Sequence, residues 1–173
     1  MSPPGPDRVN VDVLAADESR LTRRYPMTRF ARLAELLASG EGEAQAEFAF
    51  TRLPEGLAGC EVQVTGVVQL KCQRCLETFD QPLRSTARLA FVATEEEAGH
   101  VPDGYEAIAA DKGRVDLGEL VEDELLLSLP VVALHGAATQ CAGTARQAGG
   151  GESVESPAET HRPFAQLQDL LKH

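Results

Sequence analysis

The sequence predicts an α+β domain with a mainly antiparallel β-sheet, or a partly open barrel, and two flanking helices. Apolar and polar residues alternate over 43–52, 61–72 and 79–91, and this period of two is typical of strands with one buried face. Residues 28–38 and 116–129 instead carry apolar residues at helical spacing. Turn-forming Pro and Gly residues separate several of these stretches, as in a sheet of about five strands joined by short connections.

The opening third of the chain supplies two strands and one helix in this prediction. Residues 8–14 alternate and are expected to form a first strand, and 43–52 form the next. The basic cluster within 20–32 is interpreted as a solvated face. Thr28 can cap the helix over 28–38, which the Ser-Gly pair after it ends.

Length and composition fit one globular domain with tails. The chain has 173 residues, of which 43% are hydrophobic and 25% charged. The first 13 residues lack the apolar core of a signal peptide, and the longest nearly apolar run, 125–134, is too short to span a bilayer. Four cysteines in such a chain favour a reducing compartment over a disulfide framework. A cytoplasmic protein without membrane contact is expected.

The chain is expected to divide into three parts. Residues 1–142 contain the predicted strands and helices. Residues 143–161 are rich in Gly, Ala, Ser and Glu and predict a flexible linker with little capacity to form a core. Residues 162–173 carry a short apolar stripe, too short for a stable isolated helix. This last segment is expected to dock onto the domain or onto a partner.

Charge is unevenly distributed along the chain. The net charge is −11, but residues 1–94 hold 11 Lys and Arg against 12 Asp and Glu, whereas 95–173 hold 5 against 15. Affinity for phosphate backbones comes mainly from Lys and Arg. Any contact with nucleic acid should therefore use the first half of the chain or occur through a protein partner.

Cys72 and Cys75 form a C-x-x-C pair at the expected tip of a hairpin between two alternating stretches. Two thiols at this spacing can converge on one tetrahedral metal ion. The same spacing also serves redox chemistry, usually with the first cysteine at a helix N-terminus, but strand-like sequence precedes this pair. Metal binding or a structural role is therefore favoured, and two packed thiols remain an open interpretation.

Two later residues could complete a metal site. His135 and Cys141 have suitable ligand types, so the candidate zinc set is Cys72, Cys75, His135 and Cys141. The second half of this set is irregular in spacing. Cys60 has no partner at ligand spacing and is interpreted as a packed thiol.

The stretch 116–129 is the best-defined helix. Asp116 can cap its N-terminus, and the proline after 129 ends it. Glu122 and Asp123 lie opposite the apolar arc of the helical wheel, whereas Glu124 falls inside that arc. A carboxylate there must be hydrogen-bonded, paired or at the edge of the buried face, and Arg74 is a conceivable partner. The sequence contains no phosphate-binding loop, nucleophile elbow or HExxH motif, and nothing in it argues for catalysis.

Several stretches together resemble the YceD family, the bacterial large ribosomal RNA subunit accumulation proteins with plastid relatives. The resemblance rests on KCQRCLETF at 71–79, VDLGELVEDELLLSLPVV at 115–132, and His135 followed by Cys141. The stretch MTRFARLAELLAS and the closing RPFAQLQDLLK are also similar to that family. The resemblance implies a non-enzymatic factor needed for accumulation or processing of large-subunit (23S) ribosomal RNA. Many relatives carry a second thiol pair where this chain has only His135 and Cys141.

The resemblance and the charges give a first functional hypothesis, a ribosome biogenesis factor that binds a large-subunit RNA precursor or a basic ribosomal or assembly protein. The RNA-binding candidates are the basic residues Arg29, Arg32, Lys71, Arg74, Arg84 and Arg88. The protein-binding candidates are the acidic residues Glu122, Asp123 and Glu124. A zinc-stabilised protein-interaction module without RNA contact is the main alternative, and a thiol oxidoreductase using Cys72 and Cys75 is a weaker one. No small-molecule substrate is expected.

Overall fold

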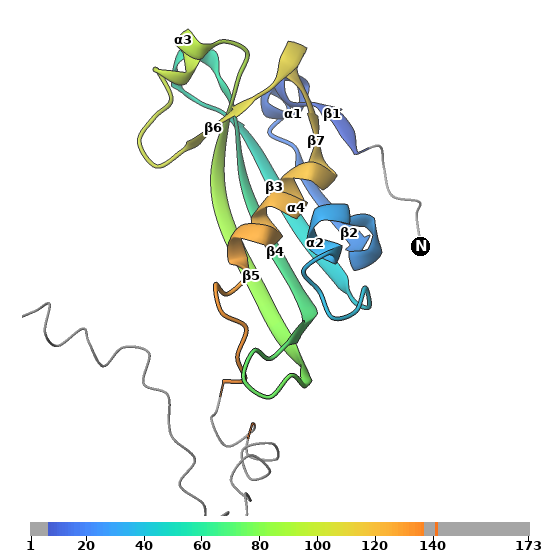
Figure 1. Ribbon diagram of the computed structural model, residues 1–173. Coiled ribbons are helices and arrows are strands. Elements are labelled where there is room, and N and C mark those ends of the chain that lie inside the picture. Colours follow the sequence, from blue (N-terminus) through green and yellow to red (C-terminus); the bar gives the residue numbers. More distant parts are fainter. Residues whose placement is uncertain (1–6, 137–140, 142–173) are drawn as a thin grey trace, which may run out of the picture.

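The computed structural model describes residues 7–136 and 141 (Figure 1). In chain order the elements are β1 (Arg8–Asn10), α1 (Val11–Ala16), β2 (Arg20–Pro26), α2 (Ala31–Ala34), β3 (Glu43–Arg52), β4 (Ala58–Lys71), β5 (Thr78–Val92), α3 (Glu95–Ala98), β6 (Glu106–Ala109), β7 (Arg114–Asp116) and α4 (Leu117–Ser128). Short 3-10 turns occupy Met27–Arg29, Pro54–Gly56 and Asp111–Gly113. The predicted linker and docking segment, 143–161 and 162–173, lie outside the described residues.

A five-stranded sheet in the order β2-β3-β4-β5-β6 forms the body of the molecule. Its first four strands pair antiparallel, and β6 pairs parallel with β5. The sheet stays open, with β2 and β6 as its edges, and β1 pairs with β7 in a separate two-stranded sheet. The predicted α+β class with a mainly antiparallel sheet is therefore confirmed.

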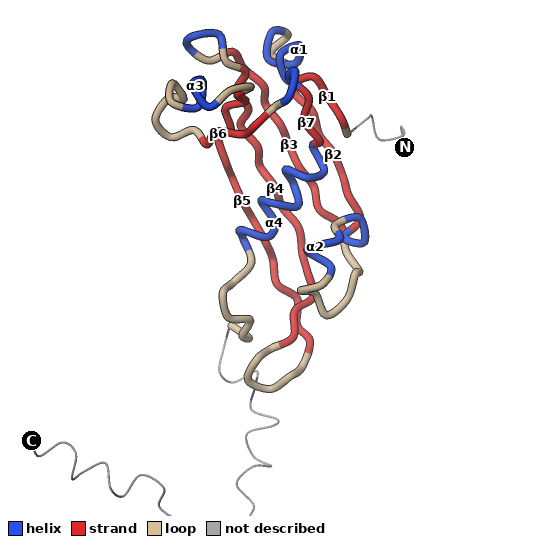
Figure 2. The backbone as a smooth tube through the Cα atoms, turned by 45° about the horizontal axis from the view of Figure 1, so that its top comes forward, coloured by secondary structure: helices blue, strands red, loops and turns tan. Residues whose placement is uncertain are grey.

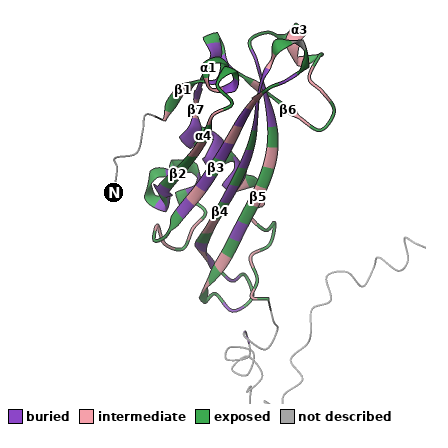
Figure 3. Cartoon of the chain, turned by 180° about the vertical axis from the view of Figure 1, so that it is seen from behind, coloured by how far each residue is buried: buried purple, intermediate pink, exposed green. Residues whose placement is uncertain are grey.

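The two faces of the sheet have different surroundings. Helices α4 and α2 lie on one face (Figures 1 and 2), where Phe48, Val62 and Leu89 of the strands pack into a buried cluster with Leu117, Val121 and Leu125 of α4. Along each strand, residues that point to this covered face alternate with residues that point to the opposite face. The opposite face is largely exposed (Figure 3). This is the pattern of an antiparallel sheet with one covered and one solvated face.

Two predicted elements differ from the structure near the N-terminus. The expected strand over 8–14 ends at Asn10, whose side chain accepts a hydrogen bond from the Val13 N–H and caps α1. The expected helix over 28–38 is reduced to a 3-10 turn and the four residues of α2. Asn is a good N-cap, and local capping here prevails over the alternating pattern.

The basic cluster within 20–32 contains a strand that was not predicted. β2 alternates, with Leu21 and Tyr25 on the covered side and Arg20 and Arg24 on the exposed side. The cluster is therefore partly a solvated face, as interpreted, and partly the edge strand of the sheet.

Helix α4 begins and ends where the sequence predicts. The Asp116 carboxylate accepts hydrogen bonds from the N–H groups of Gly118 and Glu119, at 2.9 and 3.3 Å. Gly118 also allows close packing, because a Cβ there would lie 3.0 Å from the Arg29 guanidinium. None of the helices in the described ranges combines the length and apolar character needed to cross a bilayer.

Candidate metal centre

The β4–β5 hairpin carries Cys72 and Cys75 at its tip, as predicted. The last cross-strand pair is Lys71 with Thr78, so the six residues between them form the turn. The Cys72 N–H donates to the Glu77 carbonyl at 2.9 Å, and the Leu76 N–H donates to the Cys72 carbonyl at 2.9 Å. Leu76 adopts a left-handed conformation with φ of 64°. These bonds turn both thiols towards the same side, and both are buried.

The chain after α4 returns to this tip and completes a four-residue cluster. The Gln73 N–H donates to the Ala133 carbonyl at 2.9 Å, which anchors the returning segment. The His135 ring packs on Phe79, with centroids 4.8 Å apart. Its Nδ1 lies 3.4 Å from the sulfur of Cys75 and 3.3 Å from that of Cys141.

The four ligand atoms are gathered closely enough that they could hold one metal ion. Cys72, Cys75, His135 and Cys141 each offer one atom, and all four atoms lie within 4.8 Å of one another. The sulfurs of Cys72 and Cys141 are 3.8 Å apart. A tetrahedron with zinc–sulfur bonds of about 2.3 Å has edges of about 3.8 Å. The predicted ligand set therefore comes together. The Cys72–Cys141 pair has the tetrahedral spacing, and the four atoms could hold a metal ion that prefers sulfur and nitrogen ligands.

The pKa values of the Cys72 and Cys141 thiols are shifted in opposite directions. Burial raises the pKa of the Cys72 thiol, but hydrogen bonds from the backbone, that of Cys75 first, outweigh burial and lower it to about 5. Burial and the neighbouring sulfurs raise the pKa of Cys141 to about 11. One thiolate thus makes the next harder to form, whereas a divalent cation would stabilise all three as thiolates.

Cys60 is separate from this cluster. Its side chain is fully buried in the main core, and burial raises the pKa of its thiol to about 12. This agrees with its interpretation as a packed thiol.

The acidic residues of α4 do not share one environment. Glu122 was expected opposite the apolar arc, and this expectation was wrong, because the residue is 8% exposed. Its carboxylate accepts from the backbone N–H groups of Arg32 and Leu33 and from the Arg32 guanidinium, at 2.7 to 3.1 Å. Asp123 is exposed and pairs with the same Arg32 at 2.8 Å. Glu122 therefore joins α4 to the start of α2.

Glu124 has a partner that the sequence did not reveal. It is buried, and one carboxylate oxygen accepts a hydrogen bond from the Ser85 hydroxyl of β5. The conceivable partner Arg74 lies instead in the hairpin turn and is exposed. Ser85 was identifiable only as an inward position of an alternating strand, since nothing in the sequence links it to α4.

The basic candidates for RNA contact fall into two groups. Arg29 forms an ion pair with Asp7, and Arg32 pairs with Glu122 and Asp123, so both are engaged within the chain. The others are Lys71, Arg74, Arg84 and Arg88. They are exposed and have no ion pair among the described residues, and all but Arg74 lie in the sheet. The exposed face of β2 adds Arg20 and Arg24, which sequence reasoning treated only as part of a charge cluster.

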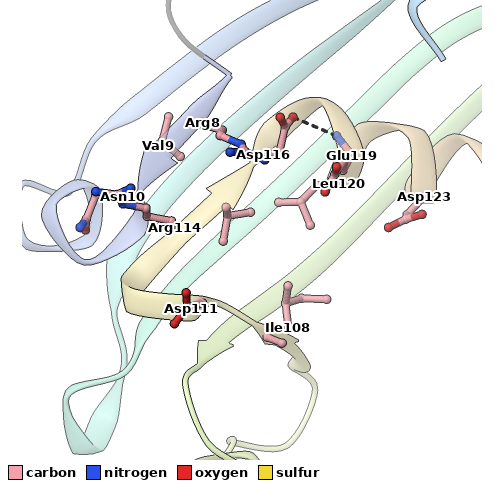
Figure 4. Close-up of a pocket in the computed structure, with 12 residues that line it drawn as sticks. Arg8, Val9, Asn10, Ile108, Asp111, Arg114, Asp116, Glu119, Leu120 and Asp123 are labelled. Carbon is pink, nitrogen blue, oxygen red and sulfur yellow. Dashed lines mark hydrogen bonds between the residues drawn. The ribbon is translucent and has the colours of Figure 1, made fainter. Parts of the chain in front are cut away.

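A separate cavity of about 740 Å³ lies between the small sheet and the start of α4 (Figure 4). Arg8, Arg114, Asp111 and Glu119 are among its lining side chains. Neither a thiol nor an imidazole of the described residues lines it. It is a site of mixed charge, distinct from the thiol cluster.

The protein is thus an open α+β domain with two distinguishing features. A cluster of three cysteines and one histidine lies at a hairpin tip, and an acidic helix that ends before a proline lies across one face of the sheet. The family model described as large ribosomal RNA subunit accumulation protein YceD matches residues 60–171. A large ribosomal RNA subunit accumulation protein YceD of Haemophilus influenzae is 34% identical over 147 residues, which cover 84% of each chain. No solved structure matches significantly. The chain belongs to the YceD family, which confirms the resemblance seen in the sequence and is consistent with a role in ribosome biogenesis.

Proposed function

We propose that this protein is a non-enzymatic cytoplasmic factor that promotes accumulation or processing of large-subunit ribosomal RNA. Its membership of a family described by that role carries the proposal. The protein binds a precursor RNA, a basic ribosomal or assembly protein, or both. The features of the site suit docking, because the charged residues lie on two different surfaces around a rigid sheet.

In this proposal the hairpin tip is held by zinc. Cys72, Cys75, His135 and Cys141 supply the four ligands, and the ion ties the segment after α4 to the β4–β5 turn. A site with four protein ligands leaves no open position for substrate, which is the arrangement of structural zinc. The metal would therefore fix the shape of this end of the molecule and take no part in turnover.

RNA contact is proposed for the exposed face of the sheet and the adjoining tip. Lys71, Arg84 and Arg88 lie on that face and are free of ion pairs among the described residues. Arg74 extends the same basic group into the turn. The engaged residues Arg29 and Arg32 are proposed to act mainly in holding the fold, with a weaker contribution to RNA binding.

The role is tested by depleting the protein and measuring the ratio of large- to small-subunit ribosomal RNA. The expected result is a lower ratio that the wild-type gene restores. A variant with Arg84→Ala and Arg88→Ala should restore it less well, and its RNA affinity should depend less on salt, with a slope reduced by about 1 to 2. An unchanged ratio after depletion would refute the proposed role.

A zinc-stabilised protein-interaction module without RNA contact is the second candidate. Glu47 and Glu61 lie on the same sheet face as the basic residues and would weaken phosphate binding there. Crosslinking in cells followed by sequencing of bound RNA separates the two candidates. Enrichment of large-subunit RNA supports the first, and its absence supports the second.

Thiol redox chemistry remains the weakest candidate. A pKa of about 5 for Cys72 is also what a redox thiol would have. However, His135 and Cys141 lie beside the C-x-x-C pair. A metal ion would use these two residues as ligands, whereas thiol exchange does not need them. Failure of the purified protein to reduce a disulfide substrate would agree with this ranking.

A further inference from the structure

A second surface of the molecule is a groove between α4 and the edge of the sheet at β5 and β6. It has a volume of about 350 Å³. Its walls are mainly aliphatic, from Leu89, Ile108, Leu120, Leu126 and Leu127. The polar residues that line it are all acidic, namely Glu106, Asp123 and Glu124, so the groove combines an apolar wall with negative charge.

Glu124 is the unusual member of this lining. It is 6% exposed, so its carboxylate is largely removed from water, which is costly for a charged group without partners. One oxygen accepts the Ser85 hydroxyl, and among the described residues the other has no hydrogen-bond donor. No lysine or arginine of the described residues lines the groove. Glu124 therefore presents an oxygen without a donor at an apolar wall. Because this oxygen is not fully buried, an incoming cation can reach it.

We propose that this groove receives a lysine or arginine side chain of a partner protein. The aliphatic stem of such a side chain would lie along Ile108 and Leu126, and its charged head would reach Glu124. Long basic side chains bury their stems on apolar surface in this way. The charged head would donate a charge-assisted hydrogen bond to the Glu124 oxygen that Ser85 does not contact, so that both oxygens of the carboxylate would then have a donor.

The surroundings favour a protein over an RNA as the occupant. Glu106 and Glu124 would repel phosphate groups, whereas Asp123 is already paired with Arg32. No Lys or Arg among the described residues lines the groove to attract a phosphate. Two apolar side chains near the groove are open to a partner, since Leu127 at its rim is 74% exposed and Val131, four residues further along the chain, is 99% exposed. A partner segment with a basic residue flanked by apolar ones matches both features. The groove is argued from its own geometry, and only the identification of the partner as a ribosomal or assembly protein rests on the proposed function.

The chemistry can be tested with two small probes on the full-length protein. Butylguanidinium carries an aliphatic stem and a cationic head, and butylurea is its neutral analogue of similar shape. NMR titration should shift the methyl signals of Leu89, Leu126 and Leu127, which line this groove but not the neighbouring cavity, with butylguanidinium, and at least fivefold less with butylurea. Equal shifts with both probes, or none with either, would overturn the proposal.

A matched pair of variants assigns the effect to one carboxylate. Glu124→Gln keeps the shape and can still accept from Ser85, but it should abolish the preference for butylguanidinium. Glu119→Gln, on the same helix but lining the other cavity, should leave the preference unchanged. A preference that survives Glu124→Gln would contradict the proposal.

Crosslinking in cells identifies the occupant. A photoreactive residue at Leu127, on the rim of the groove, should crosslink to a protein peptide containing Lys or Arg, and Glu124→Gln should reduce the yield several-fold. Crosslinks to residues 162–173 of this same chain, or to RNA, would overturn the choice of occupant. A basic partner unrelated to ribosomes would leave the groove proposal standing but count against the proposed function, so the two failures are distinguishable.

Discussion

Two polar clusters, at the hairpin tip and at the junction of α4 with α2, both join segments that are distant in sequence. The junction is complete, because the Glu122 carboxylate is matched by N–H donors from Arg32 and Leu33. The tip is a set of electron-pair donors, three sulfurs and one imidazole nitrogen, that converge within 4.8 Å of one another. The first cluster is satisfied by the protein itself, whereas the second could hold a metal ion.

This difference indicates how a buried polar group is to be interpreted. A group with all its partners in the chain is part of the fold, and a group that lacks one indicates a ligand. Glu124 lies between the two cases, since Ser85 satisfies one oxygen and the other has no donor among the described residues. Substitutions of single members of each cluster test this distinction.

The largest effect is expected from Cys72→Ser. Losing one of four ligands should reduce bound zinc from one ion per chain to near zero at submicromolar free zinc, because binding of structural zinc contributes roughly 10–16 kcal/mol in small domains. Metal analysis of the purified protein measures this directly. The thermal midpoint should also fall towards that of the chelated wild-type protein.

Cys60→Ala is the control for this variant. It removes a buried thiol from the main core and leaves the tip intact, so it should lower stability while keeping one zinc per chain. Equal metal content in Cys72→Ser and Cys60→Ala would show that the tip does not hold the ion.

Glu122→Ala should have the next largest effect. It leaves two backbone N–H groups and part of a guanidinium without their acceptor, and a cost of about 2–4 kcal/mol in the free energy of unfolding is expected. Denaturant unfolding measures it. Asp123→Ala removes only the exposed half of the same arrangement and should cost about 0–1 kcal/mol. Similar losses for both variants would contradict the distinction drawn between them.

The same cluster predicts a pH dependence. Burial raises the pKa of Glu122, but hydrogen bonds from Leu33 and Arg32 lower it by a larger amount. The pKa of this carboxyl group therefore lies below its usual range. The unfolded chain, with a pKa of about 4.3 at this residue, binds more protons than the folded one in the acid range. The contribution of Glu122 is therefore complete above about pH 5 and is lost as the pH falls through the lowered value.

The pH-dependent contribution of Glu122 is measured by comparing the free energies of unfolding of the wild type and Glu122→Gln between about pH 3 and pH 6. The stability gap between them should be widest at the upper end and shrink on acidification. A gap independent of pH would show that the carboxylate charge does not matter at this position.

The smallest effect is expected from Asp116→Ala at the start of α4. It removes the side-chain acceptor for the N–H groups of Gly118 and Glu119 and should cost about 1 kcal/mol. Thermal unfolding measures the loss, and Glu119→Ala, which keeps the cap, should cost less. An unchanged midpoint would indicate that the small sheet alone holds this end of the helix.

Strong local patterns made much of the fold predictable. The strand over 43–52, the hairpin around Cys72 and the helix from Asp116 were predicted because alternation, C-x-x-C spacing and capping are encoded within a few residues. The ligand set was predictable from residue type, although its convergence depends on where the chain runs after α4.

Long-range matches were not predictable. The interior position of Glu122 depends on two N–H groups about 90 residues earlier in the chain, and the helical wheel contains no information about them. The partnership of Glu124 with Ser85 likewise depends on how α4 lies across β5. A lone alternating stretch such as 8–14 was misleading because one good N-cap, Asn10, suffices to start a helix.

The most direct test of the central claim is X-ray absorption spectroscopy of the full-length protein loaded with one equivalent of zinc. A first shell of three sulfurs at about 2.3 Å and one nitrogen at about 2.0 Å is predicted, from Cys72, Cys75, Cys141 and His135. A shell dominated by oxygen and nitrogen, or a protein that retains no zinc after dialysis, would contradict the account.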